Sequence, residues 1–328
     1  MRFHLTRPAS AAMVAALAAT MCAVLPAVAG ASPEARISKT YKLSALRTDI
    51  VVASPSMGKD VKVSVLTPRD GHGPRPTVYL LDGAGATQGV SDWITKGRAG
   101  EFFADKNVNV VLPMGGAGTF YTNWRSDDPK LGKPQWETFL TRELPPLVDR
   151  QFDGTGRNAL IGLSMGGQAA YALLSRHPKM YSGAASLSGC PPVSGPLNQG
   201  YVRTTVAKGG GDADNLWGPP GSQLWRAHDP LLHLGALRGK NLFLSAGSGA
   251  IGPLDLAPRP TDGLPRDAVN ASGSVLELGA YRCSLEFAVQ LRQAGIKYTD
   301  GFRLIGTHSW PYWRGDLPLA WATISRGL

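Results

Sequence analysis

The feature that most constrains the fold is a serine between two glycines, in the stretch Gly162-Leu163-Ser164-Met165-Gly166. Residues 158–162 predict a short buried strand just before it, and residues 168–176 predict a helix rich in alanine and leucine just after it. A serine at such a strand-to-helix corner projects its hydroxyl above a parallel sheet, and the glycines let neighbouring backbone approach closely. The stretch therefore predicts a nucleophile elbow.

Strands and helices alternate along the rest of the chain. Apolar runs predict strands at 49–53, 61–66, 77–81, 107–112, 183–187, 241–246 and 298–304, and amphipathic patterns predict helices at 93–104, 136–148, 279–294 and 310–325. The first two strands flank a turn at 54–60 and are predicted to form an antiparallel edge of the sheet. Residues 31–46 are predicted to form an extended segment before them. This order predicts an α/β-hydrolase fold, with a mostly parallel central sheet and helices on both faces.

The N-terminus has the pattern of a targeting segment. Arg2 and Arg7 precede an apolar run that ends in Pro26-Ala27-Val28-Ala29, as in secretory signal peptides; an uncleaved membrane anchor is the alternative. We expect a signal peptide at 1–31 and one domain at 32–328, with a Gly/Pro/Trp-rich insertion at about 188–235 that forms a lid or binding loop. The protein is accordingly expected to be secreted and to lie at the cell envelope.

Charge and cysteine content narrow the choice of partners. The formal net charge is +10, which suits an anionic envelope surface or glycolipid, or only solubility. No run of Lys and Arg interleaved with aromatic residues occurs, so nucleic-acid binding has no support. Cys190 and Cys283 remain after signal cleavage, and an even count in an oxidising compartment favours a disulfide, with two free buried thiols as the alternative.

A serine nucleophile needs a base and an acid that orients the base. His308 follows the last predicted strand, where α/β-hydrolases carry their base, whereas the other five histidines occupy the signal segment, a surface turn, a helix end and a structural stretch. The acid must lie between Ser164 and His308, and the pattern alone leaves Asp255, Asp262, Asp267, Glu277 and Glu286 open. Asp255 has the ordinary position of the acid after a strand, whereas Glu277 would begin the helix predicted at 279–294, where the helix N-terminus favours a carboxylate.

Two backbone N–H groups are candidates for the oxyanion hole that a tetrahedral intermediate requires. Met165 follows the serine directly, and Ala84 lies in the loop after the strand predicted at 77–81. Gly83 and Gly85 would let that loop approach the serine, although glycines after a strand are also plain turn residues.

Several stretches together resemble the antigen 85 mycolyltransferases and their corynebacterial relatives, which are secreted acyltransferases of the α/β-hydrolase fold. The resemblance covers nearly all of the chain after the signal segment. It runs through Ser54-Pro55-Ser56-Met57-Gly58-Lys59-Asp60, Val78-Tyr79-Leu80-Leu81-Asp82-Gly83, Phe120-Tyr121-Thr122-Asn123-Trp124, Trp136-Glu137-Thr138-Phe139-Leu140, Gly162-Leu163-Ser164-Met165, Trp217-Gly218-Pro219, Asp229-Pro230-Leu231-Leu232 and Gly306-Thr307-His308-Ser309-Trp310-Pro311-Tyr312-Trp313.

The resemblance implies that Ser164 is the nucleophile, His308 the base and Glu277 the acid. It also implies transfer of a mycolyl group from trehalose monomycolate, through an acyl-serine ester, to a second trehalose glycolipid or a cell-wall sugar. No metal or organic cofactor is required. Asp82, Ser309 and Trp310 are the expected sugar contacts.

Two departures affect the expected acceptor. Gly85 stands where the family has an arginine that contacts trehalose, and Ser91 stands where it has an asparagine. Glycine cannot supply the charge-assisted hydrogen bonds of an arginine. We therefore expect acyl transfer, but these two positions do not support trehalose as the acceptor. The alternatives are a secreted carboxylesterase that uses the same three residues with water as acceptor, and a non-catalytic surface binding protein on the same fold.

Overall fold

The computed structural model describes residues 1, 3–4, 34–258, 261 and 263–328. The signal peptide predicted at 1–31 therefore lies almost wholly outside the described residues, as does Asp262. Residues Glu34–Leu328 form one compact unit. Within the described residues, no helix is long and apolar enough to cross a bilayer.

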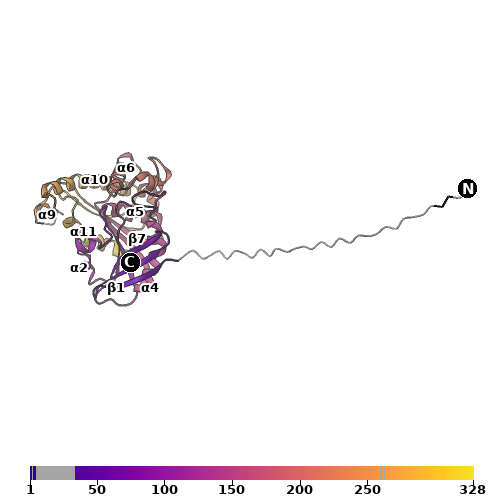
Figure 1. Cartoon of the computed structure of the whole chain (residues 1–328). Coiled ribbons are helices and arrows are strands. Elements are labelled where there is room, and N and C mark those ends of the chain that lie inside the picture. Colours follow the sequence, from indigo (N-terminus) through magenta and orange to yellow (C-terminus); the bar gives the residue numbers. More distant parts are fainter. Residues whose placement is uncertain (2, 5–33, 259–260, 262) are drawn as a thin grey trace. The chain divides into compact units, whose positions relative to one another are not determined.

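A nine-stranded sheet runs through this unit in the order β1-β2-β3-β5-β4-β6-β7-β8-β9 (Figure 1). The strands are β1 Arg36–Lys42, β2 Arg47–Ser54, β3 Lys59–Leu66, β4 Arg75–Leu81, β5 Asn109–Pro113, β6 Gly154–Leu163, β7 Tyr181–Leu187, β8 Asn241–Gly247 and β9 Thr299–Arg303. The pairs from β5 to β9 are parallel, and those among β1, β2, β3 and β5 are antiparallel. The predicted mostly parallel sheet with an antiparallel edge is thus confirmed.

The central strands are buried on both faces, which explains their continuous apolar runs. In β4, Tyr79 and Leu81 belong to one hydrophobic core, whereas Val78 and Leu80 belong to the other, because successive side chains of a strand point to opposite faces. The strand β1 was expected only as an extended lead-in. Its side chains are almost all exposed, so it carries no apolar alternation and is held mainly by its hydrogen bonds to β2.

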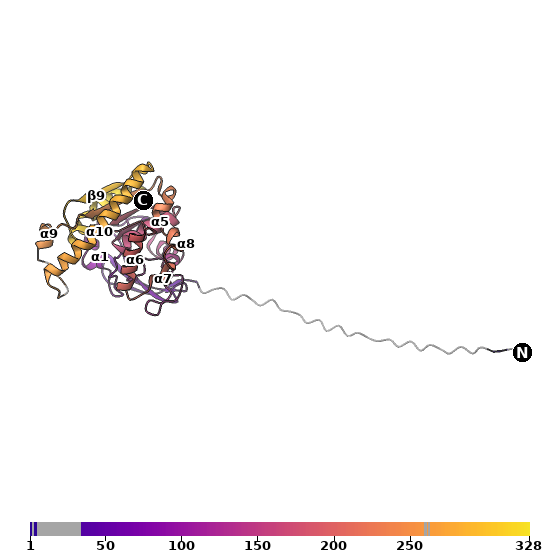
Figure 2. The same ribbon diagram turned by 90° about the horizontal axis from the view of Figure 1, so that it is seen from above.

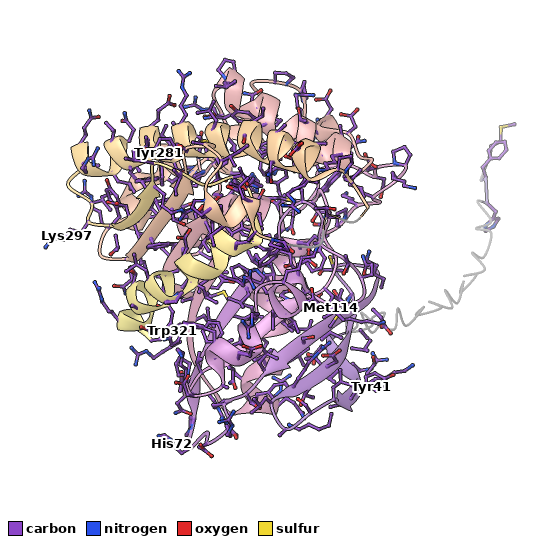
Figure 3. All side chains as sticks on the ribbon, turned by 90° about the vertical axis from the view of Figure 1, so that its left-hand side faces the viewer. Tyr41, His72, Met114, Tyr281, Lys297 and Trp321 are labelled. Atoms are coloured by element: carbon purple, nitrogen blue, oxygen red, sulfur yellow. A yellow bond between two sulfur atoms is a disulfide. The ribbon has the colours of Figure 1, made fainter. Side chains whose placement is uncertain are left out.

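Helices cover both faces of the sheet. The helical elements are α1 Asp92–Thr95, α2 Ala99–Phe103, α3 Trp136–Thr138, the π-helical turn η1 Phe139–Glu143, α4 Leu144–Phe152, α5 Met165–Arg176, α6 Pro196–Lys208, α7 Ala213–Trp217, α8 Gln223–Ala227, η2 Pro230–Leu237, α9 Pro253–Leu256, α10 Arg266–Gln293, α11 Trp310–Ile324 and η3 Ser325–Gly327. One core lies under α4, α5 and α10, and the other lies under α1, α2 and α11. Figure 3 labels Tyr281 on α10 and Trp321 on α11, the two helices that cover β8.

Three helical predictions differ from the structure. The helix expected at 93–104 is two short helices, because Arg98 between them adopts a left-handed φ of 56° and Gly97 packs against Trp93 and Trp310. The insertion expected near 188–235 as a lid or loop is mostly helical, from α6 to η2, and buries Trp217 and Trp225 in the core. The helix expected at 279–294 begins thirteen residues earlier, as α10. The prediction missed the first half of this helix because that half exposes apolar side chains and lacks an amphipathic pattern.

Candidate active site

Ser164 lies at the corner between β6 and α5, as the sequence predicts. Its φ of 52° and ψ of −122° place a non-glycine residue in a strained region of backbone space, which is typical of functional sites. The two motif glycines are explained by contact: a Cβ on Gly162 would lie 2.0 Å from the carbonyl oxygen of Gly166, and a Cβ on Gly166 would lie 2.4 Å from that of Leu81. The motif is therefore a sterically required elbow.

The loop after β4 lies against this elbow. A Cβ on Gly83 would come within 2.8 Å of the Leu163 side chain and 3.4 Å of Ser164 Cβ, so only glycine lets the loop come this close. Ala84 and Met165 both line the same cavity as Ser164. Met165 is the first residue of α5, where N–H groups have no partner within the helix, and in the described chain neither N–H donates a loop or turn hydrogen bond to a backbone oxygen. Both residues therefore lie beside Ser164 at the cavity, and their amides stay candidates for the oxyanion hole.

His308 and Glu277 meet, although 31 residues separate them in the chain. His308 Nδ1 lies 2.7 Å from Glu277 Oε2, and the Glu277 side chain is fully buried. His308 also lines the cavity that contains Ser164, so the imidazole lies between the buried carboxylate and that cavity.

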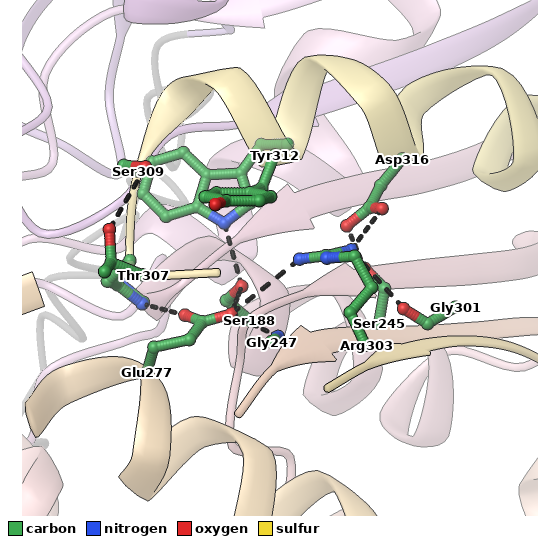
Figure 4. Close-up of polar contacts among 12 residues, drawn as sticks. Ser188, Ser245, Gly247, Glu277, Gly301, Arg303, Thr307, Ser309, Tyr312 and Asp316 are labelled. Atoms are coloured by element: carbon green, nitrogen blue, oxygen red, sulfur yellow. Dashed lines mark hydrogen bonds and ion pairs between the residues drawn. The ribbon is translucent and has the colours of Figure 1, made fainter. Parts of the chain in front are cut away.

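Figure 4 shows how the Glu277 carboxylate is held. Its Oε1 accepts hydrogen bonds from Ser188 Oγ at 2.7 Å and from the Gly247 N–H at 2.6 Å, and Arg303 Nη2 lies 3.9 Å away. Trp313 Nε1 in turn donates to Ser188 Oγ at 2.8 Å. The sequence argument placed Glu277 at a helix N-terminus, and this was wrong because Glu277 lies in the interior of α10. The carboxylate is held instead by Ser188 just after β7, by Gly247 at the end of β8 and by the nearby Arg303 at the end of β9.

The other acid candidates that the structure describes do not hydrogen-bond to the His308 ring. Asp255 is buried but accepts hydrogen bonds from Tyr312 and Thr307, and Glu286 pairs with Arg282 on the exposed face of α10. Asp267 is exposed in the first turn of α10. Of the candidates that the structure describes, Glu277 is the one that reaches the His308 ring.

A cavity of about 500 Å³ opens beside Ser164, which lies in the usual range for ligand sites. Its wall is largely apolar, and residues of α6 and α10 make up much of it. Seen from above, these helices lie next to each other (Figure 2), and Tyr201 packs on Gly279. The apolar lining residues include Phe120, Leu163, Val202, Val275, Leu276, Ala280, Trp310 and Trp313, and the polar ones include Asp92, Asn198, Thr204, Thr205 and Lys208. The site can therefore hold an apolar chain with a polar group beside it.

The three expected sugar contacts lie in different environments. Trp310 lines the cavity and packs edge-on against Trp93 and Trp313. Asp82 is 1% exposed and does not contribute to the lining, and burial raises the pKa of its carboxyl group to about 7, while the nearby Ser91 hydroxyl partly lowers it. Ser309 also lies outside the lining and contacts Thr307. Of the three, only Trp310 faces the cavity.

The positions that depart from the family pattern also have defined places. Gly85 lines the cavity, and a Cβ there would meet no atom within 4 Å. Ser91 is buried and caps α1 by accepting a hydrogen bond from the Trp93 N–H. Gly85, where the resemblance led us to expect an arginine, thus leaves open space at the cavity wall, whereas Ser91 acts within the fold.

Cys190 and Cys283 form a disulfide, with their Cα atoms 5.3 Å apart and 93 residues between them in sequence. Cys190 follows β7 and lines the cavity, and Cys283 lies in α10 six residues after Glu277. The bridge therefore ties the helix that carries the acid to the end of a central strand.

Sequence reasoning missed Ser188 and Arg303, which hold Glu277. Ser188 directly follows an apolar strand, and its φ of 50° marks a second strained corner, but only the first of these features is visible in a sequence. Two histidines set aside as structural, His177 and His228, approach the buried Glu137. Within the described residues, no cluster of three or more His, Cys, Asp or Glu is arranged to hold a metal.

Comparison with known proteins shows the family of this chain. The Esterase family model matches residues 54–324. The diacylglycerol acyltransferase/mycolyltransferase Ag85A of Mycobacterium leprae is 31% identical over 326 residues, covering 93% of this chain and 89% of that protein. The chain belongs to the antigen 85 family.

Two further proteins are similar to this chain over most of its length. The antigen 85 protein Ag85C of Mycobacterium avium is 32% identical, covering 93% of this chain and 83% of its own. The crystal structure of Mycobacterium tuberculosis MPT51 matches with a TM-score of 0.69 and 30% identity, covering 88% of this chain and 99% of that one. The predicted α/β-hydrolase fold is thereby confirmed.

Proposed function

We propose that this protein is a serine acyltransferase that moves a long-chain, mycolyl-type acyl group between sugar hydroxyls through an acyl-Ser164 ester. The observation that carries the proposal is the His308–Glu277 pair beside a mostly apolar cavity that also contains Ser164. Antigen 85 relatives named as diacylglycerol acyltransferases/mycolyltransferases support an enzyme of the acyltransferase or esterase type. The Cys190–Cys283 disulfide is consistent with an oxidising, extracytoplasmic location at the cell envelope.

The residues have distinct roles in this proposal. His308 accepts the Ser164 proton as Ser164 Oγ attacks the ester carbonyl of a glycolipid donor, and Glu277 orients the imidazole and stabilises its positive charge. The N–H groups of Ala84 and Met165 donate to the oxyanion of the tetrahedral intermediate. His308 then protonates the leaving sugar oxygen, which leaves an acyl-serine ester.

The second half of the reaction uses the same groups in reverse. An acceptor hydroxyl enters the cavity, His308 removes its proton, and its oxygen attacks the acyl carbonyl. Collapse of the second intermediate returns the proton to Ser164 and releases the new ester. A trehalose glycolipid or a cell-wall sugar is the proposed acceptor, with Trp310 as the sugar contact that faces the cavity.

A fluorophosphonate probe and intact-protein mass spectrometry test this proposal. The wild-type protein is expected to gain the mass of one acyl group after incubation with a glycolipid donor, and Ser164→Ala is expected to show neither that mass nor probe labelling. Labelling that survives in Ser164→Ala would remove Ser164 from its role.

Hydrolysis is the second candidate, because the chain matches the Esterase family model and water can replace the sugar as acceptor. Product analysis with a long-chain ester and an added sugar separates the two reactions. A transferase forms new sugar ester in proportion to the acceptor, whereas a hydrolase releases only free acid. Absence of turnover on activated esters by the folded protein would instead support a non-catalytic binding protein.

A further inference from the structure

Exposed apolar side chains gather on one side of the domain. Between residues 34 and 328, sixteen large hydrophobic side chains are exposed among those described, and eleven of them lie in three segments around the cavity. We call these eleven residues the apolar rim: Leu197, Tyr201, Ile251, Leu254, Leu256, Leu264, Val275, Leu276, Leu278, Leu304 and Ile305. Seven of them lie on α6, α9 and α10, three helices along the same, upper side of the domain in Figure 1.

The rim is continuous with the mouth of the cavity. Tyr201, Val275 and Leu276 are exposed and also line the cavity. A Cβ on Gly249 would lie 3.3 Å from Leu278 Cβ, so the chain after β8 packs directly on this part of α10. The apolar surface therefore extends from the cavity across α10 to the segment that precedes α9.

A second contact joins that segment to the loop before His308. The N–H of Gly249 donates to Gly306 O, and the N–H of Gly306 donates to Ala250 O. A Cβ on Gly252 would lie 3.0 Å from the side chain of Ile305. Residues 251–256 and 304–305 thus belong to one surface, although about 50 residues separate them in sequence.

This surface is unusual for a soluble domain. Leu304 is 84% exposed, Val275 is 73% exposed and Leu256 is 62% exposed, whereas soluble proteins seldom expose contiguous apolar patches of this kind without a partner. Ten of the eleven side chains are aliphatic. The charged residues beside them are Lys208 and Asp92 at the cavity and Arg266 and Asp267 at the start of α10, while the whole chain carries a formal net charge of +10. An exposed aliphatic surface on a chain with a net positive charge is the pattern of proteins that dock on lipid surfaces.

We propose that the apolar rim docks the protein on a lipid surface, so that an acyl chain passes from the lipid layer into the cavity without crossing water. The proposal rests on the proposed function for the identity of the acyl donor, but the docking itself does not require catalysis. The occupant is a lipid layer with anionic headgroups, because the rim leads directly to the cavity and the net positive charge of the chain complements negative headgroups.

Sedimentation with phosphatidylcholine vesicles that contain phosphatidylglycerol tests the docking. The measurement uses Ser164→Ala, so that binding is separated from acyl transfer. The triple variant Leu254→Gln/Leu256→Gln/Leu304→Gln is expected to partition at least about tenfold less to these vesicles, since each change removes an aliphatic side chain from the lipid contact. A matched control, Leu43→Gln/Leu232→Gln/Val289→Gln, changes three exposed residues outside the rim and is expected to partition as the parent does.

The same substitutions with Ser164 intact are then assayed on a soluble short-chain ester and on a long-chain ester held in vesicles. The rim variant is expected to retain its rate on the soluble ester, which shows that it is folded, and to lose about tenfold on the vesicle-bound ester. If the triple variant does not fold, Leu304→Gln alone takes its place. We then expect smaller losses of vesicle binding and of the rate on the vesicle-bound ester.

Three results would overturn the proposal. They are a parent protein that does not bind the vesicles, a folded rim variant that binds them as strongly as the parent, and a rim variant that loses only self-association in sizing experiments, which would assign the rim to a second copy of the chain. Failure of the proposed function gives a different result from failure of the docking proposal. The soluble ester would then not be turned over by the wild type or by any rim or control variant, while Ser164→Ala would still bind the vesicles.

Discussion

Glu277 holds His308 with one carboxylate oxygen and is itself held by the other. Oε2 lies 2.7 Å from His308 Nδ1, whereas Oε1 accepts hydrogen bonds from Ser188 and from the Gly247 N–H. With Nδ1 engaged by the carboxylate, Nε2 is the ring nitrogen left for the cavity and for Ser164. The orientation of the proposed base is therefore set jointly by Ser188 after β7, Gly247 on β8 and Glu277 on α10.

Glu277→Gln tests this arrangement with little change in shape. The amide oxygen can still accept from Ser188 and Gly247, but the side chain no longer stabilises a positive imidazole or selects its tautomer. We expect kcat on a short-chain nitrophenyl ester to fall on the order of 10³- to 10⁴-fold, with little change in thermal stability. A loss below about tenfold would exclude Glu277 as the acid.

Asp255 is expected to position the loop that carries His308. It is fully buried and accepts hydrogen bonds from Thr307 Oγ1, from Tyr312 Oη at 2.8 Å and from the Gly252 N–H at 2.9 Å. Asp255→Ala leaves these donors without their acceptor, at about 1–3 kcal/mol for each buried group. Urea unfolding should show this loss, and kcat should fall more than KM changes.

Tyr312→Phe is the milder comparison, because it removes one donor and leaves the carboxylate and Thr307 in place. We expect it to cost about 1 kcal/mol and to retain most of the activity. Equal effects of Asp255→Ala and Tyr312→Phe would contradict a role for Asp255 in holding the Thr307 side of the loop.

Two helical glycines should respond oppositely to alanine. In Gly166→Ala the new Cβ would meet Leu81 O at 2.4 Å and Asp82 O at 2.6 Å, so the loop that presents Ala84 must move. We expect a loss of stability above about 2 kcal/mol and a large loss of kcat. Gly100→Ala is the control, because α2 has open space there and alanine favours a helix by up to about 1 kcal/mol. Thermal unfolding and ester hydrolysis measure both.

The buried Asp82 predicts a pH dependence of stability. Burial raises the pKa of its carboxyl group from the ordinary value of 3.8 to about 7. Between those pH values the folded protein keeps a proton that the unfolded chain has released, so the contribution of Asp82 to the free energy of unfolding falls as pH rises. Asp82→Asn should flatten the profile and stabilise the protein near pH 8, by at most about 4 kcal/mol. Parallel profiles for the two proteins in urea unfolding would refute this.

The disulfide closes a long loop, since 93 residues separate its cysteines. Cys190→Ser/Cys283→Ser is expected to cost about 2–4 kcal/mol in unfolding free energy, measured against the wild type with and without reductant. Reductant should lower the stability of the wild type toward that of the variant and leave the variant unchanged. Because α10 carries both Cys283 and Glu277, kcat is expected to fall as well.

Sequence reasoning succeeded where a local pattern has one physical meaning. A serine between glycines after an apolar run requires a sharp corner, and the contacts of Gly162 and Gly166 show why. It failed where the pattern is weak: β1 is almost fully exposed and the first half of α10 points apolar side chains outward. Neither element has the alternation or amphipathic period on which a prediction from sequence depends.

By itself, the sequence determined the elbow at Ser164, the order of strands and helices and the pool of acids and histidines, because these depend on neighbouring residues. Only the tertiary structure decided that Glu277, rather than Asp255 or Glu286, reaches His308, and that Asp82 is buried away from the cavity. The physical reason is that Glu277 is held by Ser188, Gly247 and Arg303, which lie at or just after the ends of three different strands. Contacts of that kind depend on how the chain returns to the same point in space.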